Sequence, residues 1–92
     1  MTVEFEWDDA KARTNLRKHG ISFVDATSAF YDVLSVTIPD PDHSAGEHRF
    51  LLIGITVAGR LVVVSHTDRG RRIRIISARR ATRRERATYE KA

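Results

Sequence analysis

The 92-residue chain contains no cysteine, so disulfide bonds and thiolate chemistry are excluded. That composition fits a reducing compartment. Unbroken apolar runs are at most four residues long, as at 61–64, far below the roughly 20 apolar residues that a membrane-spanning helix needs. The first nine residues are acidic and lack the basic and apolar regions of a signal peptide. We therefore expect a cytoplasmic protein that does not associate with membranes.

Motifs for metals and cofactors are also missing from the sequence. A Gly-rich phosphate loop and a nucleophile elbow are both absent. Residues 39–47, PDPDHSAGE, superficially resemble a calcium loop but lack its ladder of Asp and Asn and its closing glutamate. The histidines do not show the i, i+4 spacing of a helical zinc site; they are His19, His43, His48 and His66. The sequence therefore predicts neither a metal ion nor a cofactor.

Lysine is scarce in this chain, whereas arginine is abundant: there are three lysines and thirteen arginines. Residues 1–48 hold nine acidic and four basic side chains, and residues 49–92 hold three acidic and twelve basic ones. A solvated charged surface would explain some of this asymmetry, but lysine would serve solubility equally well. The planar guanidinium fork matches phosphate and carboxylate, so the bias indicates a basic surface for a polyanion.

The hydrophobic pattern predicts one α+β domain over residues 1–92, with the order β-α-α-β-β-β-β-α and helices packed on one face of a largely antiparallel sheet. Asp8 or Asp9 caps the first helix, and Gly20 is its expected stop. Ser22 begins a second helix with a capping-box pattern. The expected strands are 3–7, 34–38, 48–57, 60–67 and 72–77, and the expected helices run to about residue 19, to about residue 31 and over 79–91.

The register of the central strands decides which side chains share a face of the sheet. A two-residue turn at 58–59 places Ile53 opposite Val64, and a turn at 69–70 places Ile75 opposite Val64 as well. We then expect Leu51, Ile53, Ile55, Val62, Val64, His66, Ile73 and Ile75 on the face beneath the helices. The open face would carry Phe50, Leu52, Val63, Ser65, Thr67, Arg72 and Arg74.

Arginines dominate residues 69–90, where nine of 22 residues are arginine. RNA carries its own nucleophile, the 2′-hydroxyl, so a protein can cleave it with a base, an acid and cations directed at the phosphorane. Arg74 on a strand could converge with Arg79 and Arg83 of the following helix. Salt bridges to the acidic half of the chain are the structural alternative.

Candidates for the acid and the base are few. Glu85 could act as a base or orient an arginine, but Thr82-x-x-Glu85 also fits a capping box. Tyr89 lies one turn later and could be an acid or a packing residue. Glu47 and His43 lie in a polar loop, where catalytic groups are often found.

Three segments carry a resemblance to a known family. They are FEWDDAKARTNLRKHGISFVDATSAFYD, HSAGEHRFLLIG and RIRIISARRATRRERATYE. Together the chain resembles the BrnT toxins of type II toxin–antitoxin systems over about residues 5–90. The resemblance implies a RelE-like fold and a metal-independent ribonuclease that arrests translation. It also implies a BrnA-type ribbon-helix-helix antitoxin that neutralises the toxin and represses the shared operon, so that operator DNA is contacted only through the antitoxin.

The family motif falls on Trp7, Asp8, Lys11, Asn15, Lys18, His19, Gly20, His43, Glu47, Arg49, Arg74, Ser77, Arg79, Glu85 and Tyr89. From these and the arginine run we predict catalytic roles for Arg74, Arg79, Glu85, Glu47 and Tyr89, and RNA contacts by Arg69, Arg72, Arg83, Arg84 and Lys18. The base stays open among Glu85, Glu47 and a histidine. A non-catalytic nucleic-acid-binding module and an interaction subunit are the alternative functions.

Overall fold

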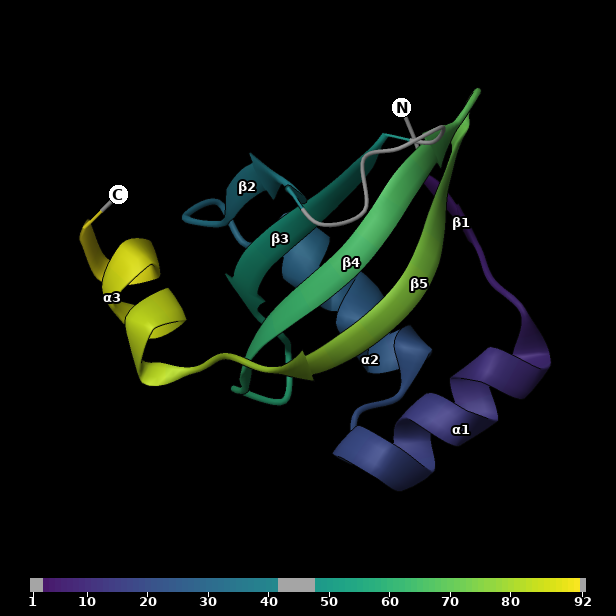
Figure 1. The fold of residues 1–92 in the computed structure, drawn as a ribbon, viewed down its shortest axis with the longest axis horizontal. Coiled ribbons are helices and arrows are strands. Elements are labelled where there is room, and N and C mark those ends of the chain that lie inside the picture. Colours follow the sequence, from purple (N-terminus) through teal and green to yellow (C-terminus); the bar gives the residue numbers. More distant parts are fainter. Residues whose placement is uncertain (1–2, 42–47, 92) are drawn as a thin grey trace.

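The computed structural model describes residues 3–41 and 48–91. They form a five-stranded sheet with three α-helices and one 3₁₀ turn, which confirms the α+β class (Figure 1). No helix in these two ranges is long and apolar enough to cross a membrane. The elements are β1 (Glu4–Glu6), α1 (Asp9–His19), α2 (Phe23–Ser28), η1 (Ala29–Tyr31), β2 (Val36–Pro39), β3 (Arg49–Ile55), β4 (Leu61–Arg69), β5 (Arg72–Arg80) and α3 (Arg83–Lys91).

The sheet is mixed, with the strand order β1-β5-β4-β3-β2. β1 pairs with β5 in parallel, and the other three pairs are antiparallel. The acidic N-terminal strand therefore lies beside the arginine-rich strand β5. β1 pairs only with Arg72–Arg74, so the outer edge of the rest of β5 has no strand beside it within the described ranges.

The helix termini follow the capping residues of the sequence. The Asp8 side chain accepts a hydrogen bond from the backbone N–H of Lys11 at 3.1 Å, and Gly20 ends α1 with φ +72°. Ser22 caps α2 in the same way through the N–H of Asp25 at 3.0 Å. Gly20 suits this position because a left-handed backbone is strained for other residues. Both predicted helix starts are confirmed.

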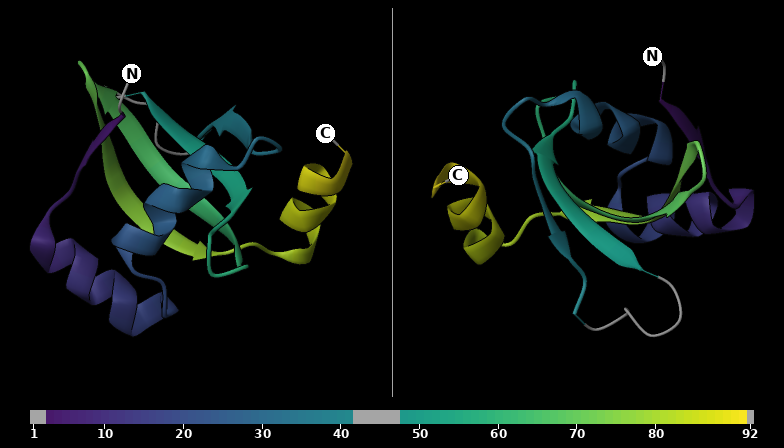
Figure 2. Two further views of the ribbon diagram at one scale, coloured as in Figure 1. Left: turned by 180° about the vertical axis from the view of Figure 1, so that it is seen from behind. Right: turned by 90° about the horizontal axis from the view of Figure 1, so that it is seen from above.

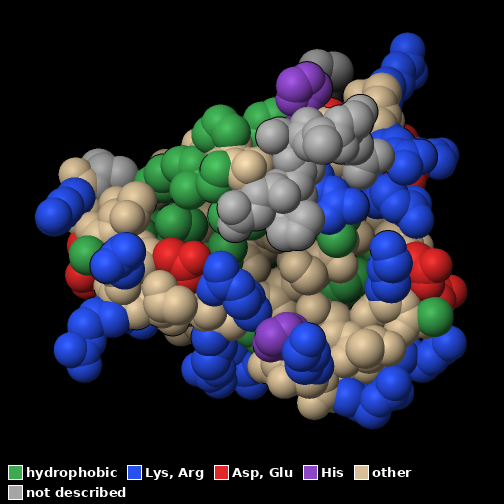
Figure 3. Space-filling view, in the orientation of Figure 1, with side chains coloured by type: hydrophobic (Ala, Val, Ile, Leu, Met, Phe, Trp, Pro, Cys, Tyr) green, Lys and Arg blue, Asp and Glu red, His purple; other side chains and the backbone are tan. Residues whose placement is uncertain are grey.

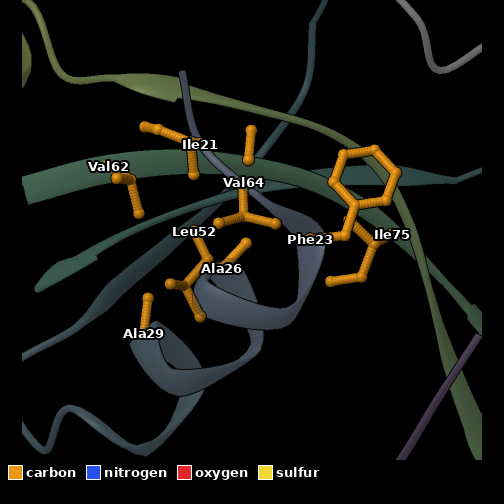
Figure 4. Close-up of a cluster of buried hydrophobic side chains, with 9 residues drawn as sticks. Ile21, Phe23, Ala26, Ala29, Leu52, Val62, Val64 and Ile75 are labelled. Atoms are coloured by element: carbon orange, nitrogen blue, oxygen red, sulfur yellow. The ribbon is translucent and has the colours of Figure 1, made fainter. Parts of the chain in front are cut away.

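The main core lies between the sheet and the helices α1 and α2, which cover the same face of it (Figures 1 and 2). Figure 4 shows side chains of α2, of η1 and of the loop before α2 meeting those of β3, β4 and β5. Burying each large apolar side chain stabilises the fold by roughly 1.5–3 kcal/mol. The cluster consists of Ile21, Phe23, Ala26, Ala29, Leu52, Val62, Val64, Ile75 and Ala78.

Asn15 is a polar side chain buried in this interface, with a relative exposure of 6%. Its amide N–H₂ donates to the carbonyl oxygens of Ile21 at 3.0 Å and Ala78 at 2.8 Å, and its oxygen accepts from the N–H of Ala78 at 3.1 Å. The two bonds to Ala78 join α1 to the open edge of β5, and the bond to Ile21 fixes the chain that follows α1.

The first central hairpin differs from the prediction. The turn spans Thr56–Arg60, with the N–H of Thr56 donating to the carbonyl of Arg60 at 2.9 Å, so Ile53 lies opposite Val63 rather than Val64. A one-residue change in register exchanges the two faces of a strand. The predicted faces of β3 were therefore wrong: Phe50 and Leu52 face α1 and α2, whereas Leu51, Ile53 and Ile55 lie on the opposite face.

The second hairpin also differs, because Arg69 pairs with Arg72 and the turn lies at residues 70–71. The predicted pairing changes by two residues, so the predicted faces of β4 and of residues 72–75 are kept. A β-bulge then follows: His66 pairs with Ile75 but Ser65 pairs with Ser77, which leaves Ile76 as the extra residue.

The bulge decides where the end of β5 points. Strict alternation would place Ser77 and Arg79 on the face opposite Arg72 and Arg74. Because Ile76 is extra, all four side chains lie on one face, the face away from α1 and α2.

The last helix begins later and lies elsewhere than predicted. Arg79 and Arg80 belong to β5, where they pair with Val63 and Val62, and α3 begins only at Arg83. Tyr89 of α3 packs with a second buried cluster, Ile53, Leu61 and Val63, on the face away from α1 and α2. The prediction that all helices cover one face was therefore wrong.

We expect Asn15→Ala to lower the free energy of unfolding by about 3 kcal/mol, because it leaves three buried backbone groups without partners. Urea denaturation measures this loss. The adjacent exposed variant Thr14→Ala is the control and should change stability by less than about 0.5 kcal/mol. Equal stabilities of the two variants would show that the Asn15 contacts contribute little.

Candidate functional site

A hollow of about 310 Å³ opens on the face of the sheet away from α1 and α2. Its floor is a row of neighbouring residues on three strands, in which Leu51 lies opposite Ser65 and Ser65 opposite Ser77. Arg49 and Arg79 flank this row on opposite sides, because Arg49 precedes the row on β3 and Arg79 follows it on β5, and these strands run in the same direction. Among the described residues, the lining is Asp40, Arg49, Leu51, Ser65, Ile76, Ser77 and Arg79.

Arg79 is held by a two-pronged ion pair with Glu85. Its Nη1 and Nη2 donate to the two carboxylate oxygens at 2.7 and 2.8 Å. Nη1 also donates to the carbonyl of Arg80 at 3.3 Å. A guanidinium carries five N–H donors. Within the described part of the chain, the Nε–H and one Nη2–H of Arg79 are therefore left without a hydrogen-bond partner.

Glu85 has two structural tasks at once. One carboxylate oxygen accepts the N–H of Thr82 at 2.8 Å, and the Thr82 hydroxyl accepts the N–H of Glu85 at 3.2 Å, which is a capping box. The hydrogen bonds from Arg79, together with those of Thr82, lower the pKa of Glu85 to about 2. So acidic a carboxylate is a poor proton acceptor near neutral pH, and Glu85 is placed to orient Arg79 instead.

Arg74 and Arg72 lie on the same face as Arg79 but beside the acidic strand β1. The guanidinium of Arg74 bonds to Glu6 at 2.8 Å, and this hydrogen bond lowers the pKa of Glu6. Arg72 lies 3.7 Å from Glu4 and 3.8 Å from Glu6. The predicted salt bridges to the acidic half of the chain are therefore present here. Arg74 and Arg79 are separated by the row that contains Ser77, so the structure does not bring them into contact.

Tyr89 fastens α3 to the sheet. Its hydroxyl donates to Asp32 at 2.7 Å, and that bond raises the pKa of the tyrosine. The same carboxylate accepts the N–H of Ile55 at 2.9 Å. Tyr89 is not part of the described lining of the hollow, and its contacts are those of a structural anchor.

The other predicted RNA-contacting residues lie around the hollow on exposed surface. Arg69 and Arg72 are at the tip of the β4–β5 hairpin, Arg83 and Arg84 are in the first turn of α3, and Lys18 is on α1. Figure 3 shows Lys and Arg side chains around a hollowed region on this side of the molecule. The predicted Glu47 and His43 lie outside the described residues.

His66 is buried in the core against Phe30 and Phe50, and burial lowers its pKa. Among residues 3–41 and 48–91, no three His, Asp or Glu side chains group so as to hold a metal ion. Arg49 and Asp40 also line the hollow, although the sequence pattern predicted no role for either. Arg49 lies in the family motif, and that signal could have identified it.

The pH dependence of stability tests the Arg79–Glu85 pair. The pKa of Glu85 is about 2 in the folded protein and 4.5 ordinarily, so its contribution is complete above about pH 4.5 and is lost as the pH falls toward 2. We expect Glu85→Gln to cost about 1–2 kcal/mol at pH 7 and less at pH 3, measured by urea denaturation. Glu90→Gln, an exposed site on the same helix, is the control. A cost that is equal at both pH values would contradict the ion pair.

Comparisons with known proteins agree with this architecture. The family model for the ribonuclease toxin BrnT of type II toxin–antitoxin systems matches residues 7–85. The crystal structure of the ribonuclease toxin BrnT of Brucella abortus is similar, with a TM-score of 0.69 and 25% sequence identity over 89% of this chain and 100% of the Brucella chain. None of the curated proteins matches the chain. The family match covers every residue of the hollow, and it confirms the resemblance read from the sequence. The chain belongs to the BrnT family of ribonuclease toxins of type II toxin–antitoxin systems.

Proposed function

We propose that the protein cleaves RNA internally and without a metal ion, in the hollow between Arg49 and Arg79. The observation that carries the proposal is that Arg79 is held by Glu85 at one end of its guanidinium and keeps two N–H groups for a ligand. Glu85 fixes the guanidinium end-on, and its free Nε–H and Nη2–H form a second fork of donors. Such a fork matches two oxygens of a phosphate. Because the ion pair holds the fork in place before RNA binds, little reorganisation is needed as charge develops on the phosphorus.

The reaction follows from RNA's own chemistry. A base takes the proton of the 2′-hydroxyl, and the oxygen attacks the adjacent phosphorus to form a phosphorane. Arg79 stabilises the extra negative charge on the phosphorane oxygens, with Arg49 on the other side of the floor. The 5′-oxygen then leaves and takes a proton from an acid. The products are one fragment ending in a 2′,3′-cyclic phosphate and one beginning with a 5′-hydroxyl.

The base is Glu47 or a histidine in this proposal, since Glu85 is bonded to Arg79 through both oxygens. Arg74 contributes positive potential beside the hollow rather than direct contact, because Glu6 already binds it. Tyr89 keeps α3, and with it Glu85, in place.

The exposed arginines give the RNA strand a path across this face. Arg69 and Arg72 would hold phosphates at the hairpin tip, and Arg83 and Arg84 would hold phosphates at the start of α3. Such contacts carry affinity and position the strand without reading its sequence.

Membership of the BrnT family supports further proposals about the fold, the cellular effect and the antitoxin partner. We propose a RelE-like fold, a cytoplasmic site of action and growth arrest through RNA cleavage. We also propose that a BrnA-like ribbon-helix-helix antitoxin neutralises the protein and contacts operator DNA on its behalf. Co-expression with a candidate ribbon-helix-helix protein encoded next to the toxin gene, followed by co-purification and rescue of growth, tests the antitoxin.

The cleavage proposal is tested by incubating the purified protein with RNA in EDTA. We expect fragments that end in 2′,3′-cyclic phosphate. We expect Arg79→Gln to lower kcat about 10²–10³-fold, which is the usual cost of removing one donor to a transition-state oxyanion. Arg80→Gln is the matched control, because Arg80 is the next residue on β5, points to the other face and should keep its rate.

Two results would contradict the proposal. Cleavage that disappears in EDTA and returns with Mg²⁺ would show a metal-dependent reaction. RNA that is bound but never cleaved, with or without ribosomes, would favour the non-catalytic binding module.

A further inference from the structure

A second hollow, of about 340 Å³, lies between α1 and β5. It meets the Arg79 hollow at Ile76 and Ser77, which line both. The β-bulge at Ile76 lies at this junction, where β5 has passed beyond its pairing with β1. The lining consists of Ala10, Lys11, Thr14, Asn15, Lys18, His19, Ile76 and Ser77.

The chemistry of this lining suits an anion. Two lysines and a histidine provide positive or donor groups, Thr14 and Ser77 provide hydroxyls, and none of the described lining residues is acidic. Within the described part of the chain, the side chains of Lys18 and His19 form no ion pair. Both lysines are exposed, so a phosphate would reach them from solvent.

Lys11 and Lys18 lie beside β5 because they share the helix face of Asn15, which binds that strand. Lys11 is four residues before Asn15 and Lys18 is three residues after it, and these spacings share one face of a helix. The bonds of Asn15 to Ala78 turn that face toward the edge of β5. The helix dipole explains cations in the last turn, at Lys18 and His19, but it does not explain Lys11, two turns earlier on the same face.

The distance along β5 fits one strand of RNA that passes through both hollows. Ser77 lines both, and Arg79 is two residues further along the strand, about 7 Å away between Cα atoms. A phosphate at Arg79 would be bound from β5, and a neighbouring phosphate over Ser77 would be within the hollow that Lys11 and Lys18 of α1 line.

We infer that the hollow between α1 and β5 is a second phosphate subsite, which binds the RNA phosphate next to the scissile one through Lys11 and Lys18. The inference rests on the proposed function, since the scissile phosphate defines its neighbour. The protein then holds its substrate at two consecutive phosphates, one on the sheet face and one over the open edge of β5.

Binding of oligonucleotides that cannot be cleaved tests the subsite. The probes are a 2′-O-methyl dinucleotide, which has one phosphate, and the same dinucleotide with a phosphate added at each end. We expect the added phosphates to tighten binding to the wild-type protein about tenfold. In Lys18→Gln and in Lys11→Gln most of that gain should be lost. The salt dependence of a longer strand, the slope of log K on log[salt], should fall by about 0.7 for each contact removed.

Two variants are the controls. Lys18→Arg keeps the charge and should keep the gain. Arg13→Gln removes one charge from the same helix, but Arg13 lines a different hollow, between α1 and α2, so it should also keep the gain. The subsite is ruled out if end phosphates tighten binding equally in Lys18→Gln and wild type, or do not tighten it in wild type. Because the probes are not cleaved, a protein that shows the expected pattern yet leaves RNA intact keeps the subsite and loses only the proposed catalysis.

Discussion

The amide of Asn15 is the constraint on which the rest of the structure depends. β5 has no strand beside its outer edge after Arg74 within the described ranges, so the N–H and carbonyl of Ala78 would be buried without partners. Asn15 supplies both partners and also binds Ile21, which fixes the chain as it leaves α1. Ala78 lies between Ser77 and Arg79. One buried side chain thus sets the position of a helix, of a strand edge and of the candidate site on that edge.

The site and the stability of α3 are also linked. α3 has no buried residue of its own, and it is held by the Arg79–Glu85 pair, by Tyr89 on Asp32 and by packing against the second cluster. The arginine proposed to meet the phosphate is therefore also a tether of the last helix. Glu85 uses only one end of the guanidinium, so the two tasks do not compete for the same N–H groups.

Local features of the fold could be predicted from the sequence, because they depend on neighbouring residues. Asp8, Gly20 and Ser22 set helix ends through contacts within four residues. Register is different, since the loop between Thr56 and Arg60 is one residue longer than the predicted two-residue turn, and that exchanges the faces of β3. The predicted helix over 79–91 began too early, although Thr82-x-x-Glu85 marks the start of α3, because pairing with Val62 and Val63 keeps Arg79 and Arg80 in β5. The pairing of Arg79 with Glu85 could be predicted, because the two residues are only six positions apart. The place of Asp40 could not, because it depends on how the folded sheet brings β2 and β3 together.

The doubled isoleucine, Ile75-Ile76, marks the bulge in the sequence, since it breaks the alternation of β5. Before the bulge, even-numbered residues of β5 face the side of the candidate site, and after it odd-numbered residues do. If the bulge were lost while all residues were kept, Ile76 would lie opposite Ser65, and Ser77 and Arg79 would turn to the face covered by α1 and α2, while the residues before it kept their faces. One residue of spacing therefore decides whether these two side chains face the candidate site. The chemistry proposed for this strand depends on the spacing of its residues as much as on its arginines.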